Sequence, residues 1–99
     1  MIENIYKTNN NLIVSISFLT DNTLNIKEKS IYMILLSYCK EGNKWCNPSI
    51  NTDLRISTGL APKTIISSLK KLEEKGYILI EKQSNSLGKL LSNKYILLK

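Results

Sequence analysis

The feature that most restricts the fold of this chain is a short break between two helical patterns. Three residues, Gly59-Leu60-Ala61, separate a segment that begins near Ser49 from one that begins at Pro62. Glycine is favoured just after a helix, and proline is favoured at the first helical position. The break therefore predicts two helices joined by a tight turn.

Both helices of this pair have clear ends. Ser49 is a suitable cap for the first, which Gly59 ends after about ten residues. The second extends from Pro62 to Lys75, where a cation and then Gly76 are the expected terminators. Apolar residues recur in it at spacings of four and three, which predicts one buried face. The residues of that face are Ile65, Leu69 and Leu72.

An earlier helix is expected from Ile26 to about Lys40, with Glu41-Gly42-Asn43 as its stop. Asn25 is a suitable N-cap, and Glu28 completes a capping box. More than half of its circumference is apolar, which predicts a helix that is central to the core or shared with a partner chain. Its apolar positions are Ile31, Tyr32, Leu35, Leu36, Tyr38 and Cys39.

Two strands follow the last helix. Tyr77–Lys82 and Lys94–Leu98 alternate apolar and polar residues, and a polar loop over 83–93 joins them into a hairpin. Before the first helix, residues 1–23 form a polar segment in which Leu12–Ile16 is either a short strand or the entry to a helical turn. Residues 24–99 are the expected domain. The predicted fold class is α+β, mainly α: a winged helix-turn-helix of three helices and a C-terminal β-hairpin wing.

The composition excludes much chemistry. Histidine, the commonest general base and metal ligand, is absent from the 99 residues. Cys39 and Cys46 have no second pair to complete a zinc site, and we expect both to be buried, reduced thiols. The four glycines stand singly, so no phosphate-binding loop is present. We expect no enzymatic activity, no metal and no cofactor.

The expected compartment is the cytosol. No apolar segment approaches the length of a membrane span, and the first ten residues lack the basic and apolar pattern of a secretory signal.

The formal net charge of +6 is unevenly distributed. Residues 1–59 carry six cationic and five anionic side chains, and residues 60–99 carry eight and three. The first part is therefore at +1 and the second at +5. A basic half on a small domain is typical of a surface that binds a polyanion.

The sequence resembles the N-terminal winged helix-turn-helix domain of phage and plasmid replication initiation proteins of low-GC bacteria. The resemblance covers LNIKEKSIYMILLSY (24–38), WCNPSINTDLRISTGLAPKTIISSLKKLEEKGYI (45–78) and SNKYILL (92–98). Its most specific pieces are the Cys46-x-Pro48-Ser49 lead-in, LEEKGYI at 72–78 and the closing SNKY. The resemblance implies binding to double-stranded DNA.

Two features depart from that family's pattern. Ala61 stands where the family commonly has a serine or threonine cap, so the last helix lacks a side-chain cap worth about 1 kcal/mol. The family's proteins usually continue into a further domain, whereas this sequence stops at Lys99.

The candidate DNA-binding residues follow from the buried stripe of the last helix. With that stripe inward, at about 100° per residue, the opposite side faces solvent. Lys63, Thr64 and Ser67 in the N-terminal half are expected near base edges, and Lys70 and Lys71 near phosphates. Further candidates are Ser49 and Asn51 at the start of the preceding helix, and Lys82, Gln83 and Lys89 of the hairpin.

Several alternatives remain open at this stage. The role is either replication initiation, with replication proteins as partners, or transcription regulation on a mobile element. A winged helix that binds only proteins is the other class, favoured by Ile66 and Glu74 on the outer face of the last helix. A homodimer through the apolar first helix is also open. Trp45, Tyr32 and Tyr38 are expected in the core. Leu87, Leu90 and Leu91 either pack under the hairpin, which we favour, or contact a second chain.

Overall fold

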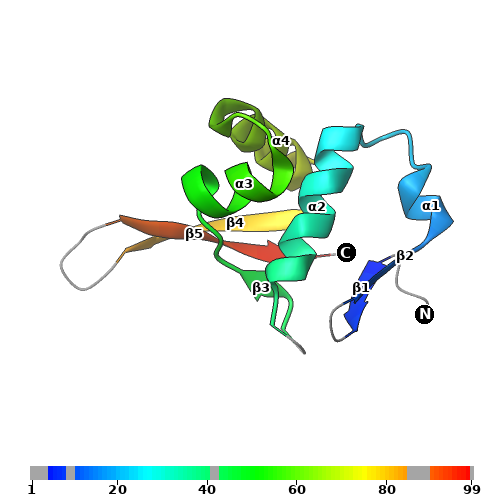
Figure 1. Ribbon diagram of the computed structural model, residues 1–99, viewed down its shortest axis with the longest axis horizontal. Coiled ribbons are helices and arrows are strands. Elements are labelled where there is room, and N and C mark those ends of the chain that lie inside the picture. The colour runs from blue at the N-terminus through cyan, green and yellow to red at the C-terminus, as the bar shows by residue number, and fades with distance from the viewer. Residues whose placement is uncertain (1–4, 9–10, 41–42, 85–89, 99) are drawn as a thin grey trace.

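The computed structural model describes residues 5–8, 11–40, 43–84 and 90–98. Its elements are, in chain order, β1 (Ile5–Thr8), β2 (Asn11–Val14), α1 (Ile16–Leu19), α2 (Ile26–Tyr38), β3 (Trp45–Cys46), the π-helical turn η1 (Ile50–Leu54), α3 (Arg55–Thr58), α4 (Pro62–Glu74), β4 (Ile78–Ser84) and β5 (Leu90–Leu97) (Figure 1). The predicted α+β class and the winged helix-turn-helix arrangement are confirmed.

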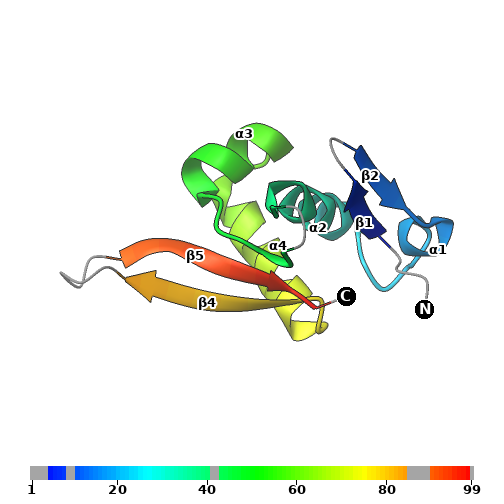
Figure 2. The same cartoon turned by 90° about the horizontal axis from the view of Figure 1, so that it is seen from below.

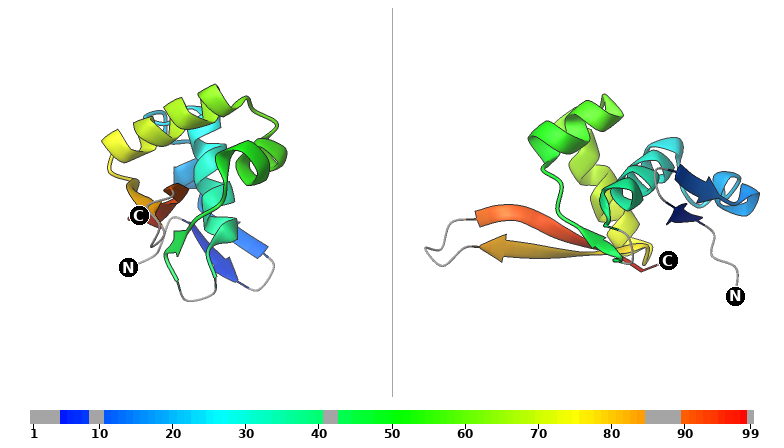
Figure 3. Two further views of the ribbon diagram at one scale, coloured as in Figure 1. Left: turned by 90° about the vertical axis from the view of Figure 1, so that its left-hand side faces the viewer. Right: turned by 60° about the horizontal axis from the view of Figure 1, so that its bottom comes forward.

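The C-terminal sheet carries three antiparallel strands in the order β3-β5-β4. Helices α2, α3 and α4 gather on one face of it (Figure 2). The hairpin β4–β5, called the wing below, projects beyond the helices along the longest axis of the molecule, which has an extent of 44 Å (Figure 1). The hairpin β1–β2 and α1 lie on the far side of α2 from the wing (Figure 3). The wing and the N-terminal hairpin therefore occupy opposite ends.

Helix α2 is the centre of the core. The Asn25 side chain accepts from the Glu28 amide at 2.8 Å, and the Glu28 carboxylate accepts from the Asn25 amide at 3.2 Å, so the predicted capping box is confirmed. Ile31, Tyr32 and Leu35 are fully buried within the single chain. The helix ends at Tyr38, slightly before the predicted Lys40, and residues 41–42 of the expected stop lie outside the described ranges.

Two aromatic residues expected in the core are at the surface. Tyr38 is 39% exposed because its hydroxyl reaches out of α2 to the Ser57 hydroxyl at 2.9 Å and ties α2 to α3. Trp45 is 40% exposed on the short edge strand β3, where the Lys94 ammonium lies 4.6 Å from the centre of its ring. Tyr32 is buried as predicted.

The N-terminal segment contains both of the alternatives that the sequence allows, the strand β2 and the short helix α1. Phe18 of α1 is buried, and its ring centre lies 5.7 Å from that of Tyr32 and 6.5 Å from that of Tyr77. Lys29 of α2 donates a hydrogen bond to the Leu19 carbonyl at 2.6 Å. The segment before residue 24 thus adds an aromatic side chain to the core.

The loop between α1 and α2 is held against the start of β4. The Tyr77 hydroxyl donates to the Asp21 carboxylate at 3.1 Å. The hydroxyl and amide of Thr23 also donate to Asp21, and these bonds lower the pKa of this carboxyl below its ordinary value. Burial raises the pKa of the Tyr77 hydroxyl, which keeps it a neutral donor. The hydrogen bond between Tyr77 and Asp21 thus holds the α1–α2 loop beside the ring that contacts Phe18.

The wing strands are longer than predicted. β4 continues to Ser84 and β5 begins at Leu90, so the expected polar loop over 83–93 is wrong at both ends. The pairs Gln83–Leu91 and Ser84–Leu90 extend the ladder after an irregularity between Glu81 and Gln83. Polar residues can continue these strands because the hydrogen bonds of the ladder join backbone groups rather than side chains. Leu87 lies outside the described residues, and the side chains of Leu90 and Leu91 are also not described.

Cys39 and Cys46 are buried thiols that form no disulfide, as predicted. Both donate to the Leu35 carbonyl, Cys39 at 3.5 Å and Cys46 at 3.3 Å. The neighbouring Cys39 thiol raises the pKa of Cys46 far above its ordinary value, and burial raises it further.

None of the helices in the described ranges could span a membrane.

Candidate nucleic-acid interface

A hydrogen-bonded turn joins α3 to α4. Gly59 adopts a left-handed conformation with φ 72°, and its amide donates to the Arg55 carbonyl at 2.9 Å. The Thr58 hydroxyl donates to the Leu54 carbonyl at 2.7 Å and accepts from the Leu60 amide at 3.0 Å. Glycine adopts this φ without the steric strain of a Cβ atom. The turn predicted from Gly59-Leu60-Ala61 is therefore confirmed.

The orientation of α4 follows from its buried stripe. Ile65, Leu69 and Leu72 are buried in the core, as predicted. Ser68, in the second turn of α4, is also buried, and its small side chain allows close packing there. The opposite side of α4 is exposed along its whole length. Its exposed polar residues are Lys63, Ser67, Lys70, Lys71, Glu73 and Glu74.

The N-terminus of α4 has no side-chain cap. Ala61 occupies the N-cap position with extended backbone (φ −67°, ψ 148°), and Pro62 follows it. Because serine adopts this backbone readily, Ala61→Ser is expected to raise the free energy of unfolding by about 0.5–1 kcal/mol. Urea denaturation measures this, with Ala61→Val as the control that offers no acceptor. An unchanged midpoint for the serine variant would contradict the assignment of Ala61 as the N-cap.

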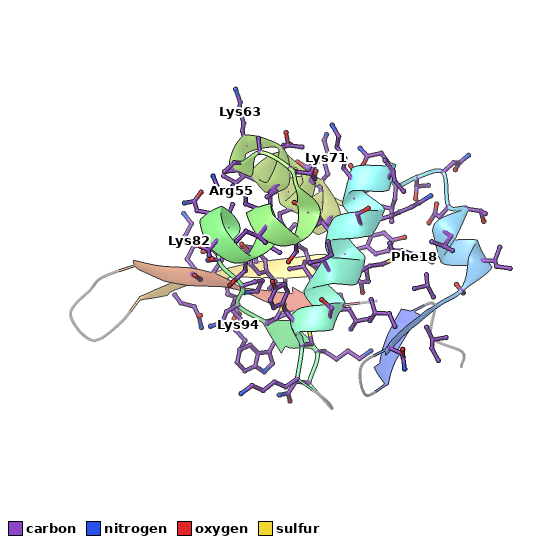
Figure 4. The ribbon with its side chains drawn as sticks, viewed as in Figure 1. Phe18, Arg55, Lys63, Lys71, Lys82 and Lys94 are labelled. Atoms are coloured by element: carbon purple, nitrogen blue, oxygen red, sulfur yellow. The ribbon has the colours of Figure 1, made fainter. Side chains whose placement is uncertain are left out.

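The cations of α4 point outward along this exposed side. Lys63 extends from the first turn and Lys71 from the third (Figure 4). Lys71 lies 3.7 Å from Glu74, but both side chains are more than half exposed, so solvent screens the pair. Thr64 is half-buried, and its carbonyl accepts from the Ser67 hydroxyl at 3.0 Å. Five of the predicted site residues, Lys63, Thr64, Ser67, Lys70 and Lys71, are thus on one helix, four of them fully on its outer face.

Residues 22–78, which are more than half of the chain, match the family model of a helix-turn-helix domain. The chain belongs to this helix-turn-helix domain family. Its matched part includes α2, α3, the turn and α4, and ends at the first residue of β4. No curated protein and no solved structure matches the chain.

Ser49 caps the first helix of the helix-turn-helix, as predicted. Its hydroxyl accepts from the Asp53 amide at 3.0 Å, and its own amide donates to the Asp53 carboxylate at 2.9 Å. These two bonds engage the Asp53 amide and the Ser49 amide that a phosphate would otherwise use. Asn51 follows and is exposed. The helix itself opens as the π-helical turn η1 and becomes α-helical only from Arg55.

The wing of the helix-turn-helix protein contributes cations to two different sides. Lys82 is exposed on β4 and lies with Lys70 of α4 on a common groove. Lys94 lies instead beside Trp45, away from α4 (Figure 4). Gln83 is half-buried on β4, and Lys89 lies outside the described residues.

Arg55 is a candidate that the sequence analysis did not name. It is exposed at the start of α3 and extends toward the end of the molecule from which the wing projects, as Lys82 does (Figure 4). In the sequence it is one of six cations in residues 1–59, whose net charge is only +1, so charge distribution alone did not single it out. We call the set Lys63, Ser67, Lys70, Lys71, Arg55 and Lys82 the basic face.

Lys75 belongs to the C-terminal basic half but not to the basic face. Its ammonium group donates to the Glu28 carboxylate at 2.8 Å and to the Thr23 carbonyl. The Glu28 side chain is only 5% exposed, so Lys75 neutralises a buried carboxylate at the start of α2.

Among the described residues, no cluster of three or more histidine, cysteine or acidic side chains could hold a metal ion.

Proposed function

We propose that this helix-turn-helix protein binds double-stranded DNA through its basic face and catalyses no reaction. The supporting observation is the outward side of α4, where Lys63, Lys70 and Lys71 are exposed opposite the buried stripe. A helix of 13 residues is about 20 Å long, sufficient to lie across a major groove. In this family of folds the second helix of the pair enters that groove.

The residues then divide by their distance from the bases. The N-terminal part of α4 enters first, so Lys63, Thr64 and Ser67 contact base edges. Lys70 and Lys71 lie further along and pair with phosphates, as does Lys82 of the wing. Lysine and serine can pair with more than one base, so discrimination by these contacts is weak. Arg55 and Asn51 approach the backbone beside the groove, whereas Ser49 caps η1 and its amide is already bonded to Asp53.

The biological role that we propose is replication initiation or transcription regulation on a phage, plasmid or other mobile element. The resemblance of residues 24–98 to replication initiation domains supports the first. Selection of bound fragments from genomic DNA separates the two. Repeats within a replication origin would support initiation, whereas sites that overlap promoters would support regulation.

Salt dependence tests the DNA contact directly. If the basic face neutralises roughly four to six phosphates, the slope of log affinity against log salt is about −4 to −5. Fluorescence anisotropy with a labelled duplex over a series of salt concentrations measures the slope. A flat response would contradict the electrostatic contact.

A protein-binding module is the second candidate, and one observation favours it. Ile66, on the flank of the outer side of α4, is 42% exposed, and Glu74 lies near the end of that side. Such a module would retain no duplex even at low salt.

A further inference from the structure

An open groove of about 330 Å³ lies between α4 and the wing. Its walls come from different elements: Ile66 and Leu69 from α4, Ile80 from β4 and Tyr95 from β5, with Ile50 of η1 at one side. This volume lies in the range of small-molecule sites, which are concave and mostly apolar.

The walls of the groove are more apolar than a surface that binds only phosphates requires. Ile66 is 42% exposed and Ile80 is half-buried, so both branched aliphatic side chains leave apolar surface open to this space. DNA phosphates gain nothing from such contacts, because their partners are cations and hydrogen-bond donors. The lining therefore fits a ligand with an apolar body.

The charges at the groove select an anion. Lys70 comes from the helix wall and Lys82 from the strand wall, and both are exposed. Among the described residues that line the groove, Glu73 is the one carboxylate, and it accepts a hydrogen bond from the Ile80 amide at 2.9 Å that joins α4 to β4. The two lysines and Glu73 together leave a net charge of +1 on the described lining. The groove is therefore complementary to an apolar ligand that carries one negative charge.

We propose that this groove binds a small amphiphilic anion, an aromatic or branched body with one carboxylate or sulfonate group. The apolar body contacts Ile66 and Ile80, and the anion lies between Lys70 and Lys82. Because these two lysines also belong to the basic face, the bound anion opposes binding of a duplex. This second consequence rests on the proposed function, whereas the site itself does not.

Two fluorescent probes of nearly the same shape test the site on the whole chain without DNA. 1-Anilinonaphthalene-8-sulfonate carries an anion, and N-phenyl-1-naphthylamine has the same apolar body without it. We expect one-to-one binding of the sulfonate, and roughly tenfold weaker binding of the neutral probe because it cannot pair with the lysines. Equal affinity for both probes would overturn the anion site.

Variants of the walls locate the probe. Ile66→Ser and Lys82→Gln are each expected to weaken sulfonate binding by roughly tenfold, through lost apolar contact and lost charge respectively. The matched controls are Ile56→Ser, exposed on α3, and Lys44→Gln, exposed before β3, which do not line the groove. Thermal melting first establishes that each variant folds. Loss of probe binding in the controls as great as in the wall variants would overturn the location.

Competition separates this inference from the proposed function. Addition of a duplex at low salt is expected to displace the sulfonate probe and reduce its fluorescence. If the duplex binds and the probe stays in place, the opposition between anion and DNA is wrong. If no duplex binds but the wall variants lose the probe, the anion site stands and the proposed function fails.

Discussion

Replacement of Lys63, Lys70 and Lys71 together by alanine is expected to weaken duplex binding by roughly two to three orders of magnitude at about 0.1 M salt. Each neutralised phosphate contributes about 0.9 to the slope of log affinity against log salt, so loss of the phosphate contacts of Lys70 and Lys71 removes about 1.8 from it. Loss of Lys63 lowers the affinity further through a lost base contact. All three side chains are exposed on the outer side of α4, so their removal leaves the core intact. Anisotropy titrations of the variant and the parent protein measure both effects.

The control for this variant changes the net charge equally at another place. Lys27, Lys40 and Lys44 are exposed outside α4 and the wing, and their triple alanine variant also loses three positive charges. We expect it to retain most of the affinity and nearly the whole salt slope, since none of these three exposed cations belongs to the basic face. Equal losses in the two variants would show that net charge, rather than the basic face, governs binding.

Replacement of Phe18 by alanine is expected to lower the free energy of unfolding by about 3–5 kcal/mol. Phe18 is 3% exposed and contacts the rings of Tyr32 and Tyr77, so its removal leaves a cavity between α1, α2 and the start of β4. A loss of this size is a large part of the total stability expected for a domain of 99 residues. Urea denaturation measures the loss.

Ile16→Ala is the control for Phe18, because Ile16 lies in the same short helix but is 76% exposed. Its effect is expected to stay within about 0.5 kcal/mol. If Phe18→Ala were equally mild, α1 would not contribute to the core, and the domain would be stabilised by residues 24–98 alone.

The sequence was sufficient where local signals and burial agree. The repeat of Ile65, Leu69 and Leu72 defines the inward side of α4, and Asn25 with Glu28 defines the start of α2. The glycine turn between α3 and α4 could also be predicted, because a positive φ is specific to few residues. These features orient α4, and with it the candidate DNA-binding residues on that helix.

Other features depend on contacts between distant segments, which periodicity does not reveal. Tyr38 fits the apolar stripe of α2 but reaches Ser57 on another helix, and Trp45 lies on an edge strand beside Lys94. Phe18 enters the core from a four-residue helix that is too short for a periodic signal. Arg55 joins the basic face only because α3 presents it toward the wing.

The most direct test of the DNA-binding face is a map of backbone amide NMR shifts during titration with a short duplex at low salt. We expect the largest shifts in the N-terminal half of α4 and in the exposed part of β4, with smaller shifts near Arg55. The hairpin β1–β2 and α1, at the opposite end of the molecule, should not respond. Shifts concentrated on β1–β2 and α1, with α4 unaffected, would contradict binding through the basic face.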